Sequence, residues 1–240
     1  MIQLQNNRAG TLYLIPVPIA EEALHTLPAE VFDITGKLEY YVAENARTAR
    51  RWIKKMHPGK NIEGIQISEI DKHAGPDTAW LLSLLKAGKT VGLMSEAGCP
   101  AVADPGSVLV QAAHSCGAKI VPLTGPSSIL LALMGSGLEG QQFAFCGYLP
   151  VKNPERSARI KALEARSAKE GETQLFIETP YRNEALLNDL LQHCGARTRL
   201  CIAQNLTAPN AFLETRKIQE WKQHMPELQK SPAIFLILAS

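Results

Sequence analysis

The chain has 240 residues, with 25 Lys and Arg against 23 Asp and Glu, so its formal net charge is +2 at pH 7. Hydrophobic residues make up 45% and charged residues 20% of the sequence, which is the usage of a globular protein and not of a disordered one. This balance excludes a histone-like, wholly basic protein but leaves room for a local basic surface. At about 150 residues per domain, the length predicts one large domain or two small ones.

The cysteines and the first ten residues predict the cellular compartment of the protein. The five cysteines are scattered and none has C-x-x-C spacing, which favours free thiols in a reducing compartment over disulfides or a zinc site. The six histidines show no metal-ligand spacing either, so we expect no metal. Residues 1–10 are polar and lack the apolar segment of a signal peptide, and no apolar run is long enough to span a membrane. We therefore expect a cytoplasmic protein.

Short strand-like runs alternate with helix-like segments, which is typical of an α/β fold with largely parallel strands. In the first half, the expected strands are Thr11–Pro16, Tyr40–Ala43, Ile65–Ile67, Thr90–Met94 and Lys119–Leu123. The expected helices between them are Ala46–Met56, Asp77–Ala87 and Ser107–Cys116.

The second half repeats this alternation less regularly. The expected helices are Ser128–Met134, Glu155–Lys169 and Glu184–His193. The expected strands are Phe143–Cys146, Thr173–Ile177, Leu200–Gln204, Ala211–Thr215 and Ala233–Leu238. Because two of these strands follow each other without a helix, we expect a mixed second sheet and a mainly parallel first one. The Gly/Pro/Ser turn at 124–128 separates an N-terminal α/β domain, 1–124, from a C-terminal α/β domain, 125–240.

The loop 95–106 is the most informative segment. It reads Ser-Glu-Ala-Gly-Cys-Pro-Ala-Val-Ala-Asp-Pro-Gly, directly after a predicted strand and before a predicted helix. Loops at the carboxyl ends of parallel strands are where α/β folds bind ligands, and its glycines permit close backbone approach. The sequence therefore predicts a ligand site here, with a merely structural turn as the alternative. The Gly-Lys-Thr at 88–90 lacks both the earlier glycine and the strand–loop–helix order of a P-loop.

Several segments, in this order, resemble the tetrapyrrole-methylase superfamily of S-adenosylmethionine-dependent methyltransferases. The family patterns are a Pro-containing loop, Ala-Glu-Asp-Thr-Arg, Ser-Asp-Ala-Gly-Thr-Pro…Asp-Pro-Gly, Pro-Gly-Pro-Ser, Gly-Phe-Leu-Pro and Glu-Ser-Pro-His-Arg. Their counterparts here are residues 15–19, 43–47, 95–106, 124–127, 147–150 and 178–182. The similarity runs from about residue 11 to 238 and is greatest to the branch that methylates a cytidine 2′-hydroxyl of small-subunit ribosomal RNA.

The resemblance implies two α/β domains with S-adenosylmethionine between them, and a homodimer. Carried over residue by residue, it implies a cofactor lining of Pro18, Ser95, Glu96, Ala97, Gly98, Val102, Ser127, Ser128, Tyr181, Ala208 and Ala233.

Three departures from the branch pattern stand out. Asn45 and Ala46 occupy positions where the pattern has an acidic residue and a threonine. Residues 205–210 read Asn-Leu-Thr-Ala-Pro-Asn, whereas the pattern has Glu-Leu-Thr-Lys…His-Glu with charged ends. Many relatives also continue into a small C-terminal domain.

Two carboxylates are candidates for the chemistry. Methyl transfer to a ribose hydroxyl needs a positioned nucleophile and is helped by a base. Glu44 and Glu178 each end a predicted strand and are the candidate catalytic residues. Arg47 and Arg182, three and four residues further on, are placed to orient a phosphate or a carboxylate. The alternative for each pair is a structural salt bridge.

Basic side chains are concentrated in two segments. Residues 45–62 hold six basic residues and no acidic one, and residues 152–170 hold six basic and three acidic ones. Together they favour binding of a phosphate backbone, although a solvated helix face is the ordinary explanation of either alone. The candidate RNA-binding residues are Arg47, Arg50, Arg51, Lys54, Lys55 and Arg182. Trp52 and Tyr181 are the candidate base-stacking side chains.

Three hypotheses of function remain open. The first is a ribosomal RNA 2′-O-methyltransferase, with ribosomal RNA or the 30S subunit as partner. The second is a methyltransferase of a small tetrapyrrole or corrin precursor, which would need an open apolar trough and not the basic helices. The third is a cofactor-sensing or RNA-binding protein without catalysis, because the charged residues near 205–210 are absent.

Overall fold

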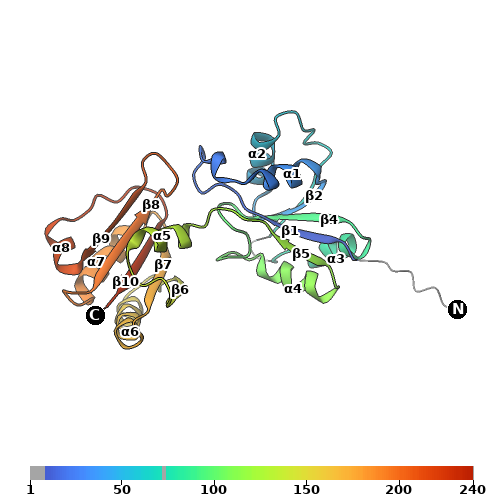
Figure 1. Ribbon diagram of the computed structural model, residues 1–240. Coiled ribbons are helices and arrows are strands. Elements are labelled where there is room, and N and C mark those ends of the chain that lie inside the picture. The colour runs from blue at the N-terminus through green and yellow to red at the C-terminus, as the bar shows by residue number, and fades with distance from the viewer. Residues whose placement is uncertain (1–8, 72–73, 240) are drawn as a thin grey trace. The chain divides into compact units, whose positions relative to one another are not determined.

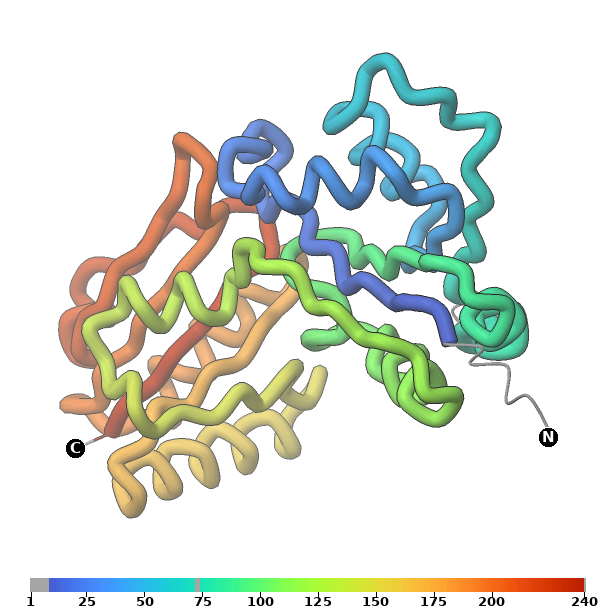
Figure 2. The backbone as a smooth tube through the Cα atoms, turned by 45° about the vertical axis from the view of Figure 1, so that its right-hand side comes forward, coloured from blue at the N-terminus to red at the C-terminus, as the bar shows by residue number. Residues whose placement is uncertain are grey.

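The computed structural model describes residues 9–71 and 74–239, shown as a ribbon in Figure 1. Most of the polar segment 1–10 therefore lies outside the described residues. The chain forms two compact units, Met1–Pro126 (unit 1) and Ser127–Ser240 (unit 2), each with its own five-stranded sheet. The chain completes unit 1 before it enters unit 2, as the colours from blue to red show in Figure 2.

Unit 1 is a doubly wound sheet in which every strand pair is parallel. Its strand order is β3-β2-β4-β1-β5. The strands are β1 Thr11–Ile15, β2 Tyr40–Ala43, β3 Gln66–Glu69, β4 Thr90–Met94 and β5 Lys119–Pro122. The helices are α1 Ala29–Lys37, α2 Ala46–Met56, α3 Thr78–Lys86 and α4 Ser107–Ser115, with a 3-10 turn η1 at Leu24–Thr26. The expected parallel sheet is thus confirmed, and all its carboxyl ends lie at one edge.

Two apolar cores cover the two faces of this sheet. On β1, Tyr13 and Ile15 contribute to the core beneath α1 and α2, whereas Leu12 and Leu14 contribute to the core beneath α3 and α4. This alternation follows from the two-residue period of a strand, and burial on both faces explains the continuous apolar runs.

Unit 2 holds a mixed sheet of order β6-β7-β10-β8-β9, as expected. Only β6 and β7 pair in parallel, and the other neighbours are antiparallel. The strands are β6 Phe143–Tyr148, β7 Thr173–Glu178, β8 Arg199–Gln204, β9 Phe212–Lys217 and β10 Ala233–Leu238. The helices are α5 Ser128–Ser136, α6 Glu155–Glu170, α7 Asn183–His193 and α8 Ile218–Gln223.

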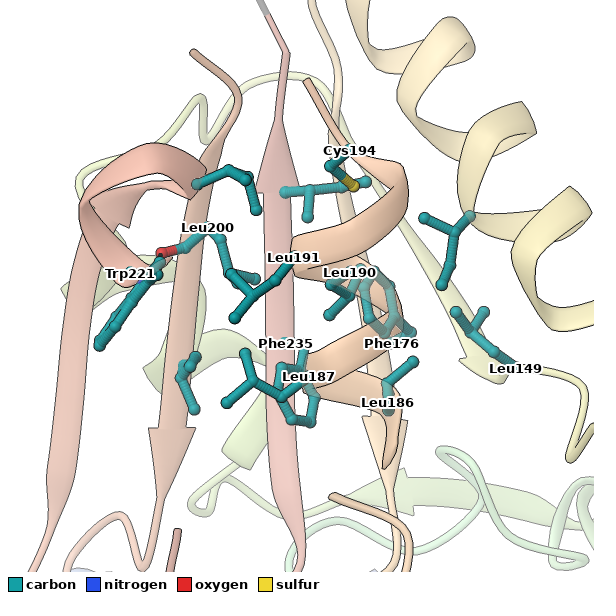
Figure 3. Close-up of a cluster of buried hydrophobic side chains, with 14 of the residues drawn as sticks. Leu149, Phe176, Leu186, Leu187, Leu190, Leu191, Cys194, Leu200, Trp221 and Phe235 are labelled. Atoms are coloured by element: carbon teal, nitrogen blue, oxygen red, sulfur yellow. Dashed lines mark hydrogen bonds between the residues drawn. The ribbon is translucent and has the colours of Figure 1, made fainter. Parts of the chain in front are cut away.

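The core of unit 2 lies between the sheet and α6, α7 and α8. Figure 3 shows the leucines of α7 directed at the rings of Phe176 and Phe235, which stack with centroids 6.0 Å apart. Trp221 of α8 is buried beside them and donates its indole N–H to the Leu200 carbonyl at 2.8 Å. The opposite face of the sheet is covered by α5.

Candidate functional site

The carboxyl edge of the unit 1 sheet places the loop 95–106 against the segment that follows β1. Val17 and Gly98 form an antiparallel bridge, in which the two backbone N–H···O bonds measure 2.9 and 3.1 Å. Ser95 is buried and donates its hydroxyl hydrogen to the Ala97 carbonyl at 3.2 Å. The structure therefore brings Pro18, next in the chain after Val17, to the 95–98 turn, and Glu96 and Ala97 of that turn are exposed.

Glu44, directly after β2, also lies at this turn. Its Oε1 atom accepts the backbone N–H of Glu96 at 3.1 Å. Burial raises the pKa of the half-buried Glu44 carboxyl, the hydrogen bond from Glu96 opposes this, and the charges of Asp104 and Glu96 add to the increase. A carboxylate with a raised pKa is a stronger base, so the position and chemistry of Glu44 suit proton abstraction.

Asp104 holds the outer part of the loop. Its carboxylate accepts the backbone N–H of Ala101 at 2.9 Å and that of Gly106 at 2.7 Å. Ala101 and Ala103 have left-handed backbones, with φ of 65° and 61°, a conformation that costs an L-residue about 1 kcal/mol. Between them, Val102 is 51% exposed. The Asp104 hydrogen bonds thus support a strained turn that presents an apolar side chain to solvent.

The turn at 124–126 packs against the same loop. The Cys99 thiol lies 3.4 Å from the Pro126 carbonyl oxygen and 3.7 Å from that of Gly125. A Cβ atom on Gly125 would lie 2.2 Å from the Cβ of Pro16, so only glycine permits this approach. The loop, the segment after β1 and this turn consequently form one packed edge.

In unit 2, Glu178 ends β7 opposite Ala233 of β10, and Ala233 lies opposite Gln204 of β8. The Glu178 carboxylate is fully buried. Its Oε1 atom accepts the backbone N–H of Thr179 at 2.7 Å and the Nε hydrogen of Arg182 at 2.8 Å, and the Arg182 Nη2 atom lies 2.6 Å from it in an ion pair. Glu178 and Arg182 therefore form the salt bridge that the sequence left as an alternative.

Aromatic side chains lie close to Arg182. Its guanidinium carbon is 6.0 Å from the centroid of the Tyr148 ring, a cation–π geometry. Tyr148 is 54% exposed and Tyr181 is 96% exposed. Sequence reasoning selected Tyr181 but missed Tyr148, although the Gly-Tyr-Leu-Pro segment at 147–150 contains it.

The segment 205–210 is held by neutral amides. The side-chain NH₂ groups of Asn205 and Asn210 both donate to the Gln229 side-chain oxygen, at 2.5 and 2.8 Å. The Ala208 N–H donates to the Asn205 carbonyl at 2.9 Å, and Thr207 has a left-handed backbone with φ of 74°. The charged residues expected from the branch pattern are thus replaced by an uncharged hydrogen-bond network.

Helix α2 begins two residues after Glu44. The Asn45 side chain accepts the Thr48 N–H at 2.9 Å as the N-cap, so the amide performs the capping role of an acidic residue. The Ala46 N–H donates to the Glu69 carboxylate at 2.9 Å. The basic side chains that the helix exposes are Arg47, Arg50, Arg51, Lys54 and Lys55.

Trp52 is not available for base stacking, and this expectation was wrong. Its side chain is 3% exposed, because it packs in the core beneath α1 and α2. Arg51 and Lys55 cover the ring at 5.6 and 5.1 Å from its centroid.

The basic segment 152–170 exposes fewer free cations than its composition suggests. Arg156 is buried and donates to Asp189 at 2.5 Å, and Arg166 pairs with Glu172 at 2.9 Å. The segment is therefore partly structural.

Comparison with known proteins decides the family. The model of the tetrapyrrole (corrin/porphyrin) methylases matches residues 12–221. This chain belongs to the tetrapyrrole methylase family. Family membership places it among the methyltransferases.

The similar sequences carry a common name. Ribosomal RNA small subunit methyltransferase I of Micromonospora olivasterospora is 35% identical over 199 residues, which cover 83% of this chain and 60% of that protein. The protein of the same name from Vibrio cholerae is 31% identical over 206 residues, or 84% of this chain and 66% of the relative. The methylase chain thus spans about two thirds or less of the length of these two relatives.

Solved structures support the fold. Uroporphyrin-III-C-methyltransferase from Thermus thermophilus has a TM-score of 0.58 at 16% identity, with 95% of this chain and 92% of that chain covered. A conserved hypothetical protein from Aeropyrum pernix K1 has a TM-score of 0.66 at 14% identity, with 96% and 85% covered.

Within residues 9–71 and 74–239, no three His, Cys, Asp or Glu side chains gather as metal ligands. In the same described part of the chain, no helix has the length and apolar character to cross a membrane.

Proposed function

We propose that this tetrapyrrole methylase uses S-adenosylmethionine to methylate the 2′-hydroxyl of a cytidine ribose in small-subunit ribosomal RNA. The observation that best supports this proposal is the position of Glu44. Its carboxylate binds the 95–98 turn, and the exposed basic helix α2 begins two residues later. A candidate base, a candidate cofactor turn and a surface for a polyanion therefore lie within one unit. The names of the relatives support the substrate.

The loop 95–106 suits S-adenosylmethionine, which supplies a methyl group on a positively charged sulfur. Gly98 has φ of +73°, a backbone conformation that favours glycine, and it permits the tight turn in which Glu96 and Ala97 are exposed. The carboxylates of Glu44, Glu96 and Asp104 surround the turn and complement a cation. In unit 1, Pro18, the 95–98 turn and Val102 would hold the cofactor.

In unit 2, two of the proposed cofactor residues are near buried acceptors that lack donors, because Ala233 lies opposite Glu178 and Tyr181 lies between Glu178 and Asn183 in the chain. Glu178 Oε2 and Asn183 Oδ1 have no hydrogen-bond partner among the described residues. Because an unpaired buried acceptor costs about 1–3 kcal/mol, an amine or hydroxyl of a ligand would stabilise this edge. The residues proposed to contribute from this unit are Ser127, Ser128, Tyr181, Ala208 and Ala233.

The two candidate carboxylates receive different roles. Glu44 would accept the proton of the attacking hydroxyl, because burial raises the pKa of its carboxyl and its Oε2 atom is free of the Glu96 hydrogen bond. Glu178 is bound to Arg182 and Thr179, so we assign it a positioning role at the edge of the second sheet. The exposed cations of α2 would bind phosphates.

Methyl transfer to undermethylated 30S subunits tests the proposal. We expect label from [methyl-³H]-S-adenosylmethionine in the ribosomal RNA, in a nuclease-resistant dinucleotide that contains a 2′-O-methylated cytidine. Glu44→Gln keeps an oxygen for the Glu96 N–H but cannot take a proton, so it should lose activity at least 100-fold, while calorimetry shows a loss of cofactor affinity that is at least tenfold smaller. Label that never enters RNA would refute the proposed substrate. Label that enters a porphyrin or corrin precursor instead would favour the small-molecule alternative.

We further propose that the protein acts as a homodimer in the cytoplasm, where ribosomal subunits are found. Light scattering coupled to size-exclusion chromatography tests the dimer. A mass of about 26 kDa at micromolar concentration, equal to the 26.2 kDa of one chain, would contradict it.

A further inference from the structure

The basic side chains of α2 fall into two groups, and Glu21 separates them. The Glu21 carboxylate lies 2.7 Å from the Lys55 ammonium and 3.7 Å from the Arg51 guanidinium. The hydrogen bond from Lys55 and the charges of Arg51 and Lys55 lower the pKa of Glu21, so it is ionised at neutral pH. Arg51 and Lys55 also lie over the Trp52 ring. These two cations are therefore already engaged with one carboxylate.

Arg47, Arg50 and Lys54 form the second group. All three are exposed, and none makes an ion pair with any residue that the structure describes. At 100° per residue they lie within a stripe about 60° wide, and the helix rises about 10.5 Å from the first to the last. Phosphates of one nucleic-acid strand follow each other at about 3.4 Å along a duplex axis, so this stripe can contact more than one of them.

An open groove of about 660 Å³ adjoins the stripe, between α2 and the loop that follows it. Arg50, Arg51 and Lys54 line it from the helix, and Asn61 and Glu63 line it from the loop. The Lys60 ammonium donates to the carbonyls of Thr35, Gly36 and Leu38 at 2.7–2.9 Å, and so fixes the loop to the end of α1. The groove thus has an anchored wall and an excess of positive charge, with Glu63 as the one carboxylate among its lining residues.

We propose that this groove and the adjoining stripe bind RNA phosphates through Arg47, Arg50 and Lys54, and that Glu21 competes with RNA for Arg51 and Lys55 and thereby limits the affinity. The inference rests on the proposed function, since the polyanion is taken to be the RNA substrate. The Glu21 side chain is 49% exposed and those of Arg51 and Lys55 are 50% and 36% exposed. Ion pairs this exposed are weak, so a phosphate can displace the carboxylate.

Glu21→Gln tests the competition, because it should increase the affinity for RNA, whereas a misfolded variant would not bind RNA more tightly. The probe is a fluorescein-labelled 20-nucleotide oligocytidylate, measured by anisotropy from 20 to 200 mM NaCl. Release of two cations should tighten binding about three- to tenfold at 100 mM NaCl and steepen the slope of log K against log salt by about 1.4. Glu22→Gln is the matched control, since Glu22 is exposed, adjacent and without an ion pair among the described residues. It should change affinity less than twofold.

The double variant Arg51→Gln/Lys55→Gln distinguishes the release of these two cations from the general effect of removing one negative charge. In this double variant, adding Glu21→Gln should increase the affinity for RNA no more than adding Glu22→Gln does. Arg50→Gln/Lys54→Gln should reduce the salt slope by about 1.4. If Glu21→Gln equals Glu22→Gln while 30S subunits are still methylated, this inference is overturned and the proposed function stands. If the wild-type protein binds no oligocytidylate at 20 mM NaCl and labels no RNA, both fail.

Discussion

Arg182→Met should destabilise unit 2 strongly, because it removes the cation that neutralises a buried carboxylate. Glu178 is fully buried, and the Arg182 side chain that covers it is 28% exposed. Of the two hydrogen bonds to Glu178 Oε1, Arg182 donates one and the Thr179 backbone donates the other, and Arg182 Nη2 adds an ion-pair contact at 2.6 Å. Methionine retains the volume of the aliphatic stem but donates no hydrogen bond.

The magnitude follows from the hydrogen bond and the ion-pair contact that are lost. A hydrogen bond to a charged group contributes about 1.5–3 kcal/mol, and a buried charge left without its partner costs about 1–3 kcal/mol more, so the two losses set a range of about 2.5–6 kcal/mol. Water can enter part of the space that Arg182 leaves at the surface, which favours the lower end. We therefore expect a loss of about 3 kcal/mol, consistent with the 3–5 kcal/mol typical of broken buried pairs. Adding Glu178→Gln removes the unpaired charge and should restore about 1.5 kcal/mol.

Urea unfolding followed by fluorescence measures this loss. Trp221 is the one tryptophan of unit 2, so a background with Trp52→Phe and Trp80→Phe makes the emission specific for that unit. Arg197→Met, at an exposed turn position, is the control and should change the free energy of unfolding by less than about 0.5 kcal/mol. A loss for Arg182→Met no larger than that of the control would refute the assigned role of the salt bridge.

Three more outcomes are expected. Gly125→Ala places a Cβ 2.2 Å from Pro16 and should cost about 2–3 kcal/mol in urea unfolding, whereas Gly140→Ala, with no atom within 4 Å, should cost less than about 1 kcal/mol. Burial raises the pKa of the Cys99 thiol, so iodoacetamide at pH 7.5 should modify it more slowly than free cysteine, as peptide mass spectrometry can measure; an equal rate contradicts this. Burial also raises the pKa of Glu44 above its ordinary 4.5. The methyl-transfer activity should therefore decrease on acidification at a pH above 4.5, and the residual activity of Glu44→Gln should not show this decrease. Because the folded protein binds this proton more tightly than the unfolded chain does, wild-type unit 1 should gain stability relative to Glu44→Gln as the pH falls towards 4.5.

Three strands with strong apolar runs could be predicted from the sequence to the residue, whereas three elements with weak ones were missed or displaced. Strands β2, β4 and β10 begin and end where the sequence predicts, because each is a continuous buried run. Helix α1 was missed, since it buries only Val31 and Thr35 and carries no strong apolar stripe. Helix α8 was also missed, because it has six residues and directly follows a strand. The predicted strand at 65–67 was displaced and runs instead from Gln66 to Glu69.

The candidate site was predictable where it is local in the chain and not where it depends on distant contacts. The loop 95–106 carries its own glycines, prolines and flanking strand. Glu21 is 34 positions from Lys55 and has no local pattern that indicates the pairing. Trp52 was misassigned for a geometric reason. It lies on α2 beside the apolar residues Ala49 and Ile53, and only the packing of α1 shows that the buried face is wide enough to include its ring.

The contrast between Glu44 and Glu178 shows why one sequence pattern leads to two chemistries. Each carboxylate lies at the carboxyl end of a strand and is followed closely by an arginine. After Glu178, the Arg182 N–H donates to the Thr179 carbonyl at 3.0 Å, and this turn brings the guanidinium back to the carboxylate. After Glu44, the Asn45 cap starts a helix at once, so Arg47 is carried away from Glu44 and makes no ion pair within the described chain. Burial without a cation makes Glu44 the better base, whereas burial with one makes Glu178 part of the framework. Glu44→Gln should therefore lower the methyl-transfer rate without the loss of unfolding free energy at neutral pH that is expected for Arg182→Met.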